Sequence, residues 1–108
     1  LNELAGKSRV SLDIDEQKVP IRREVLAASQ MLGLDPLHVT CEGKAILAVD
    51  QAKAEKVLKA VRRTRYGANA EIIGEANSDQ PGLVTMRTTV GGRRVVQHPW
   101  AEAIPRVC

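Results

Sequence analysis

Residues 45–65, AILAVDQAKAEKVLKAVRRTR, decide the class of fold that this sequence can adopt. Residues 45–49 form an uninterrupted apolar run, which predicts a central strand buried on both faces. Asp50 comes next and is well placed to cap the start of a helix. The following apolar residues recur at the spacing of one helix face; they are Ala54, Val57, Leu58 and Val61. A strand therefore leads directly into an amphipathic helix. This helix is expected to end around Arg63 to Arg65, because cations in the last turn suit the negative end of the helix dipole.

The same two periodicities continue on the N-terminal side of this stretch. Residues 10–14 alternate between apolar and polar side chains, which predicts a half-buried strand. From residue 21 to residue 32 the apolar side chains follow a helical stripe, and Gly33 is suited to the left-handed position that ends a helix. The pair Asp35-Pro36 then predicts a capped, short turn of helix.

On the C-terminal side the pattern is typical of strands. Residues 71–75 predict a short strand around two isoleucines, and residues 84–90 alternate as a further strand. Gly91-Gly92 separates this run from another alternating run at residues 94–96, which predicts a β-hairpin. After His98 the alternation stops, and the sequence predicts an extended tail.

The predicted elements follow the order strand, helix, strand, helix and then three strands. This order indicates an α+β fold, with two helices packed on one face of a mostly antiparallel sheet. We expect one compact domain over residues 1–98 and a flexible tail over residues 99–108, because a chain of 108 residues fits a single core. Residues 1–5 resemble the end of a helix that starts earlier, so we expect the chain to be a piece of a longer protein.

Composition limits the classes of partner. The net charge is +3, and this mild excess does not by itself indicate nucleic acid, because nucleic-acid-binding proteins concentrate positive charge on one face. The two aromatic residues, Tyr66 and Trp100, leave few rings on which bases could stack. A basic nucleic-acid-binding module is therefore the least favoured hypothesis, and we expect no nucleic-acid partner. No apolar run approaches the ~20 residues that a membrane span needs, so we expect no membrane partner.

The cysteines indicate a reducing compartment and no metal site. Cys41 and Cys108 do not make a disulfide framework, and no export signal is visible, so we expect a cytoplasmic protein. No cluster of histidine and cysteine has the spacing of metal ligands. We interpret Cys41 as a small buried apolar residue. A redox pairing of Cys41 with Cys108 is the less favoured alternative.

Cys108 is the residue best suited to covalent chemistry. A thiol at the end of an extended tail is exposed and movable, which suits a carrier that accepts a group in one place and delivers it in another. Arg106 would favour the thiolate, which is the reactive form. Position alone does not distinguish such a carrier from an incidental terminal cysteine.

Several motifs resemble the HypE family of hydrogenase expression/formation proteins. The ending Pro105-Arg106-Val107-Cys108 is similar to the family terminus, in which proline and arginine precede isoleucine or valine and a final cysteine. Interior motifs follow in the order of the family; they are Leu32-Gly33-Leu34-Asp35-Pro36-Leu37, Glu42-Gly43-Lys44, Ala54-Glu55-Lys56-Val57-Leu58, Ile72-Ile73-Gly74-Glu75 and Gly91-Gly92-Arg93-Arg94. Some of these also occur in the wider superfamily similar to aminoimidazole ribonucleotide (AIR) synthetase. The alternative is therefore the C-terminal domain of another ATP-dependent kinase or synthetase of that superfamily, in which Cys108 would be dispensable.

The resemblance implies a specific activity. HypE-like proteins accept a carbamoyl group on the C-terminal cysteine from a HypF-type carbamoyltransferase, and they use ATP to dehydrate it to a thiocyanate. The cyanide then goes to iron on a HypC–HypD complex during assembly of nickel–iron hydrogenases. We therefore expect Cys108 to be the carrier, and we expect ATP with magnesium to be bound mainly by an N-terminal domain outside this chain. The full-length protein is expected to be a homodimer, and the isolated chain is expected to be inactive.

The resemblance also assigns roles to Glu42, Gly43 and Arg106. Dehydration requires a base that removes the amide protons, and Glu42 is our candidate because it enters the predicted strand at residue 45. Gly43 would permit a backbone conformation closed to other residues and let the chain approach bound ATP. Arg106 would bind phosphate or position the tail, with a solvated charge as the equal alternative. The basic residues on and after the second predicted helix are interpreted as a solvated face; they are Lys56, Lys59, Arg62, Arg63 and Arg65.

Overall fold

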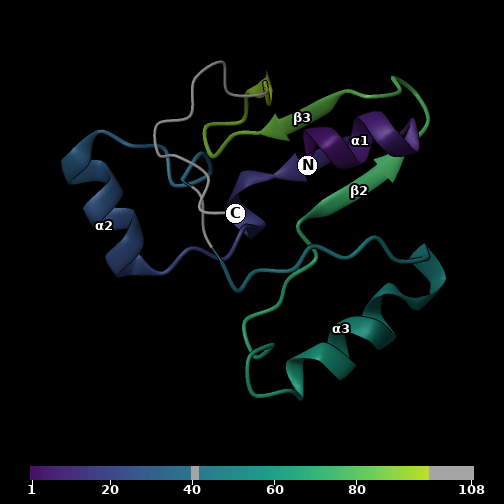
Figure 1. Cartoon of the computed structure of the whole chain (residues 1–108), viewed down its shortest axis with the longest axis horizontal. Coiled ribbons are helices and arrows are strands. Elements are labelled where there is room, and N and C mark those ends of the chain that lie inside the picture. The colour runs from purple at the N-terminus through teal and green to yellow at the C-terminus, as the bar shows by residue number, and fades with distance from the viewer. Residues whose placement is uncertain (40–41, 98–108) are drawn as a thin grey trace. The chain divides into compact units, whose positions relative to one another are not determined.

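The computed structural model describes residues 1–39 and 42–97 (Figure 1). The helices are α1 (Asn2–Ser8), α2 (Arg23–Leu32) and α3 (Ala54–Arg62), and the strands are β1 (Ser11–Asp15), β2 (Gly74–Asn77), β3 (Val84–Arg87) and β4 (Arg93–Val95). Short 3-10 turns occupy Glu16–Lys18 and Gln51–Lys53. The chain divides into two compact units. Leu1–Pro20 and Ala48–Gln97 form the first, and the described part of the second lies within Ile21–Leu47.

The first unit contains a four-stranded mixed sheet in the order β2-β1-β3-β4. β1 is antiparallel to β2 and parallel to β3, and β3 is antiparallel to β4. The predicted α+β class is confirmed, and the sheet is mostly antiparallel, with one parallel pair in its middle. The opening residues are helical, as the sequence indicates, so the chain has three α-helices in its described parts instead of the two predicted.

The core of the first unit lies on one face of the two central strands. Alternate residues of a strand point to the same face, and Leu12 lies opposite Val84 as Ile14 lies opposite Met86. All four side chains are buried, and Met86 is only 2% exposed. Ala5 of α1 is completely buried as well, so the first helix contributes to this core.

The β3–β4 hairpin forms where the two glycines predict it. Gly91 adopts a positive φ of 86°, a conformation that favours glycine. The turn is closed by the Thr88 amide, which donates to the Gly92 carbonyl at 2.7 Å, and by the Gly91 amide, which donates to the Thr88 carbonyl at 3.0 Å. Local turn chemistry therefore sets the register of this pair.

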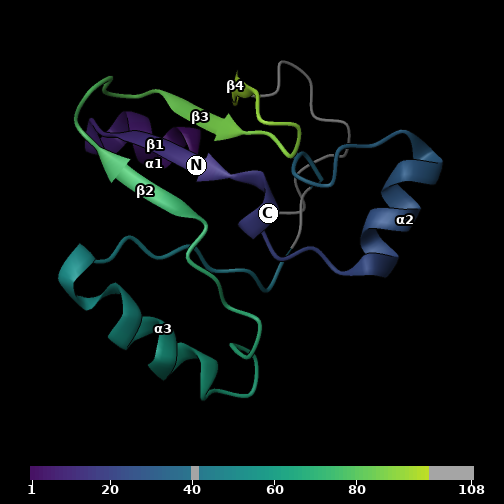
Figure 2. The same ribbon diagram turned by 180° about the vertical axis from the view of Figure 1, so that it is seen from behind.

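The predicted central strand at residues 45–49 is wrong. This segment pairs with none of the described strands, and Ile46 and Leu47 are 56% and 62% exposed. In Figure 2 the coloured parts of the chain between α2 and α3 carry no strand arrow. The physical reason is that an apolar run indicates avoidance of water but specifies no hydrogen-bonding partner, and both edges of β1 are already taken by β2 and β3.

The strand predicted at residues 71–75 is displaced towards the C-terminus. β2 begins at Gly74, although the Ile73 carbonyl still accepts a hydrogen bond from the Asp15 amide at 2.8 Å. Asp50 caps the 3-10 turn Gln51–Lys53, where its Oδ1 accepts from the Ala52 amide at 2.9 Å, and not α3 itself, whose N-cap is Lys53 without a side-chain hydrogen bond. In the parts of the chain that the structure describes, no helix is both long and apolar enough to cross a bilayer.

Candidate functional site

Helix α2, in the second unit, precedes the predicted catalytic loop and ends sharply. α2 ends at Gly33, whose φ of 66° is left-handed, as the sequence predicts. The Leu34 amide donates to the Ser29 carbonyl at 2.9 Å, and the Ser29 side chain is itself buried. This arrangement satisfies the last carbonyls of the helix and turns the chain towards the loop.

A capped turn follows. Asp35 Oδ1 accepts a hydrogen bond from the Leu37 amide at 2.9 Å, and the Asp35 carbonyl accepts from the His38 amide at 3.0 Å. The His38 Nδ1 lies 3.7 Å from Asp35 Oδ2. The short turn predicted at Asp35-Pro36 is therefore confirmed, and the chain enters the loop from an ordered turn.

Glu42 and Gly43 occupy the loop that follows. Gly43 has a φ of 76°, and a Cβ built there would meet no atom of the described residues within 4 Å. The requirement for glycine is therefore one of backbone conformation and not of packing, which confirms that part of the prediction. Glu42 is exposed, so a substrate arriving from solvent could reach its carboxylate. Its role as a base stays a prediction.

The other predicted site residues cannot be placed relative to this loop. Cys108 and Arg106 lie outside the described residues, as do Cys41, His98 and Trp100. Of the predicted site residues, the structure describes Glu42 and Gly43, which are consecutive in one loop.

A polar cluster that the sequence did not predict lies in the first unit. Asp13 is on the face of β1 opposite the core, and its side chain is 18% exposed. Its Oδ2 lies 2.5 Å from Arg93 Nη2, and its Oδ1 accepts from Thr85 Oγ1 at 3.1 Å. These contacts join residues 72 and 80 positions apart, so local patterning could not reveal them. The sequence pointed to this cluster only through Arg93, which belongs to the motif Gly91-Gly92-Arg93-Arg94.

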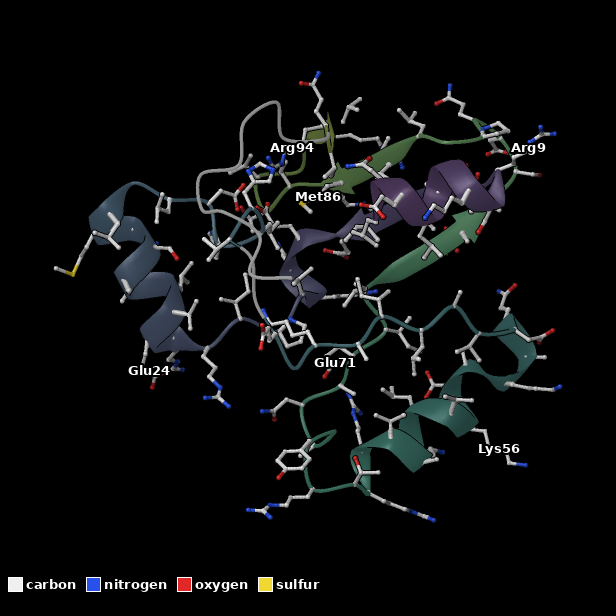
Figure 3. All side chains as sticks on the ribbon, in the orientation of Figure 1. Arg9, Glu24, Lys56, Glu71, Met86 and Arg94 are labelled. Atoms are coloured by element: carbon white, nitrogen blue, oxygen red, sulfur yellow. The ribbon has the colours of Figure 1, made fainter. Side chains whose placement is uncertain are left out.

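The neighbouring arginine of that motif faces the core side. Arg94 Nη2 lies 3.6 Å from the Met86 sulfur, and Figure 3 shows the two side chains near each other. Arg93 and Arg94 therefore make contacts on opposite faces of the sheet at β4. Within residues 1–39 and 42–97, no group of three or more histidine, cysteine, aspartate or glutamate side chains could hold a metal ion.

Comparison with known proteins places the chain in a family. Residues 1–86 match the family described as AIR synthase related protein, C-terminal domain. The chain belongs to this family. Along its full length, this AIR synthase related domain is 44% identical to the carbamoyl dehydratase HypE of Rhizobium leguminosarum bv. viciae and 43% identical to that of Azotobacter vinelandii. It covers all 108 of its own residues but 31% and 32% of those proteins, so it spans about a third of the curated relatives it matches.

Solved structures agree with this placement. A crystal structure of hydrogenase maturation protein HypE is 35% identical with a TM-score of 0.91, and the match covers 100% of this domain and 36% of that chain. A structure of HypE in complex with ATP is 34% identical with a TM-score of 0.88, over 95% of this domain and 32% of that chain. A structure of a HypE–HypF complex is 39% identical with a TM-score of 0.84, over 92% of this domain and 32% of that chain. The resemblance to HypE found in the sequence is thereby confirmed.

Proposed function

We propose that this domain is the thiol-bearing part of a HypE-type carbamoyl dehydratase. The observation that supports the proposal most strongly is the similarity over all 108 residues to enzymes named carbamoyl dehydratase HypE, which spans every predicted site residue. The structure of a related HypE in complex with ATP supports the use of ATP. The structure of a HypE–HypF complex supports a HypF-type carbamoyltransferase as the partner.

In this proposal Cys108 is the carrier. Its thiolate attacks the carbamoyl carbon presented by the transferase, so that an S–C bond forms and the bond to the previous carrier breaks. The product is a carboxamide linked to sulfur. Arg106 lies two residues away and either holds the tail in place or neutralises phosphate during the next step.

Glu42 is the base for dehydration. The amide must lose both N–H protons and its oxygen before a C≡N bond can form, and ATP supplies the phosphoryl group that makes the oxygen a leaving group. Glu42 takes the protons from the amide nitrogen, and its exposure lets it pass them on to water. Gly43 holds the loop in a left-handed conformation that brings the backbone close to the reacting groups. The product on Cys108 is a thiocyanate.

We assign nucleotide and magnesium binding mainly to an N-terminal domain outside this chain. The described residues hold no cluster of metal-ligating side chains, and they lie in a domain that spans about a third of its relatives. In the full-length protein we propose a cytoplasmic homodimer that passes cyanide to iron on a HypC–HypD complex.

Mass spectrometry of the full-length protein tests this function. Incubation with a HypF-type transferase, carbamoyl phosphate and ATP is expected to give carbamoyl and then cyano adducts on the peptide that contains Cys108. Both adducts should be absent in Cys108→Ala. Glu42→Gln should accumulate the carbamoyl adduct, whereas Glu24→Gln, an exposed glutamate of α2 in the same unit, should behave like the wild type (Figure 3). Normal dehydration by Glu42→Gln would show that Glu42 is not the base, and adducts on the Cys108→Ala peptide would overturn the carrier role.

A further inference from the structure

The exposed face of α3 has a concentration of positive charge that the proposed chemistry does not use. Lys56, Lys59 and Arg63 are all exposed, and at 3.6 residues per turn they fall within an arc of roughly 60°. We call these three residues the basic face of α3. The half-buried residues Val57, Leu58 and Val61 lie on the opposite side of the helix. Figure 3 shows Lys56 extending away from the helix.

The basic face lacks acidic partners within the part of the chain that the structure describes. None of its three cations takes part in an ion pair there. Arg62 differs, because its Nη2 lies 2.6 Å from Glu71 Oε1 and its Nε donates to the Ala70 carbonyl at 2.9 Å. Arg62 therefore joins α3 to the segment at residues 70–71, whereas the charges of the basic face are available to contact another molecule.

Helix stability does not account for these charges. A cation in the last turn interacts favourably with the helix dipole, which explains Arg63, but Lys56 lies in the first turn, where a cation is unfavourable. Lys59 is three residues from Lys56 and four from Arg63, and like charges at these spacings destabilise a helix. Glu55, four residues before Lys59, offsets part of this repulsion, and a surface of opposite charge would offset the rest.

An exposed aromatic residue follows α3 in the sequence. Tyr66 is 88% exposed, and the Arg65 guanidinium carbon lies 5.2 Å from the centre of its ring. Tyrosine and arginine are enriched among residues that dominate the binding energy of protein interfaces. The end of α3 therefore combines positive charge with an exposed ring.

We propose that the basic face of α3 docks the full-length protein onto an acidic surface of the carbamoyltransferase that loads Cys108. This inference rests on the proposed function. A protein partner fits better than a polynucleotide, because Glu55 and Glu71 interrupt the positive charge and the net charge is only +3. A structure of a HypE–HypF complex lies among the similar structures, so a related protein does assemble with a protein partner. Complementary charge at the edge of an interface acts mainly on the rate of association.

Association kinetics test the docking surface. In the full-length protein, Lys56→Gln/Lys59→Gln/Arg63→Gln should slow association with the transferase about tenfold at low salt and leave dissociation nearly unchanged. The difference should vanish near 1 M salt, where the screening length is ~3 Å. The matched control Lys7→Gln/Arg22→Gln/Arg23→Gln removes the same charge from other exposed positions and should associate like the wild type. Lys56→Arg/Lys59→Arg/Arg63→Lys keeps the charge and should do so as well.

Several outcomes would overturn the docking surface. One is an association rate in the glutamine variant equal to that of the wild type. The others are an equally slowed association in the control, or a slowed association in the variant that keeps the charge. A glutamine variant that loses binding to double-stranded DNA but not to the transferase would assign the face to nucleic acid instead. If the glutamine variant is carbamoylated on Cys108 as fast as the wild type at low salt and low concentration, the docking proposal fails while the proposed function stands. If the wild type neither binds the transferase nor receives a carbamoyl group, both fail.

Discussion

Replacing Gly43 by alanine should slow dehydration without affecting the loading of Cys108. The φ of 76° at Gly43 would cost an alanine about 1–2 kcal/mol. Among residues 1–39 and 42–97 no atom lies within 4 Å of the added Cβ, so the strain there acts on the backbone alone. Among the described residues, no backbone hydrogen bond from Gly43 holds the loop against that strain. The loop conformation that supports dehydration should therefore be populated about 5–30-fold less in the alanine variant. The dehydration rate should fall by the same factor.

Single-turnover quenching of the full-length protein measures this rate. Carbamoylated protein is mixed with ATP, and the cyano adduct on the Cys108 peptide is followed with time by mass spectrometry. Gly91→Ala is the matched control, because Gly91 has a φ of 86° and equally open surroundings but lies in the β3–β4 hairpin. The control should dehydrate at the wild-type rate. A Gly43→Ala protein that also does so, or a control that slows equally, would refute the link between this loop and the chemistry.

Further predictions concern the sheet and are measured by hydrogen exchange in the full-length protein. Met86→Ala should lower the opening free energy of β1 and β3 by about 2–5 kcal/mol, because Met86 is 2% exposed; protection equal to the wild type would contradict the assigned core. Gly74→Ala should abolish the pairing of β1 with β2, because the added Cβ would lie 2.2 Å from the Asp13 carbonyl oxygen; unchanged protection of β2 would show that this approach is not so close. Arg93→Gln should cost less than ~1 kcal/mol, because its side chain is 60% exposed in the pair with Asp13; a larger loss would mean that this ion pair organises the sheet.

Features that depend on neighbouring residues could be predicted from the sequence. The hairpin at Gly91-Gly92 and the helix end at Gly33 both require positive φ, which glycine supplies locally. The alternation at residues 10–14 likewise predicts β1, because the period of a strand is visible within five residues. The left-handed conformation of Gly43 was predicted for the same local reason.

Features that depend on distant partners could not be predicted. The apolar run at residues 45–49 has the composition of a buried strand, yet no described strand pairs with it. The parallel pairing of Leu12 with Val84 and the contact of Asp13 with Arg93 each join opposite ends of the chain. The residues next to each partner in the sequence carry no signal of the other partner, so periodicity cannot predict these two contacts. For the candidate site, sequence similarity identified Glu42 and Cys108, but no spacing in the sequence sets the distance between them.

An isotope label on the transferred carbon tests the central claim most directly. The full-length protein is incubated with the transferase, ATP and carbon-13 carbamoyl phosphate, and the labelled product is located by peptide mapping and carbon-13 NMR. We expect the label as a thiocyanate on the sulfur of Cys108. A labelled thiocyanate on Cys41, or labelled cyanide formed at the normal rate by Cys108→Ala, would contradict it.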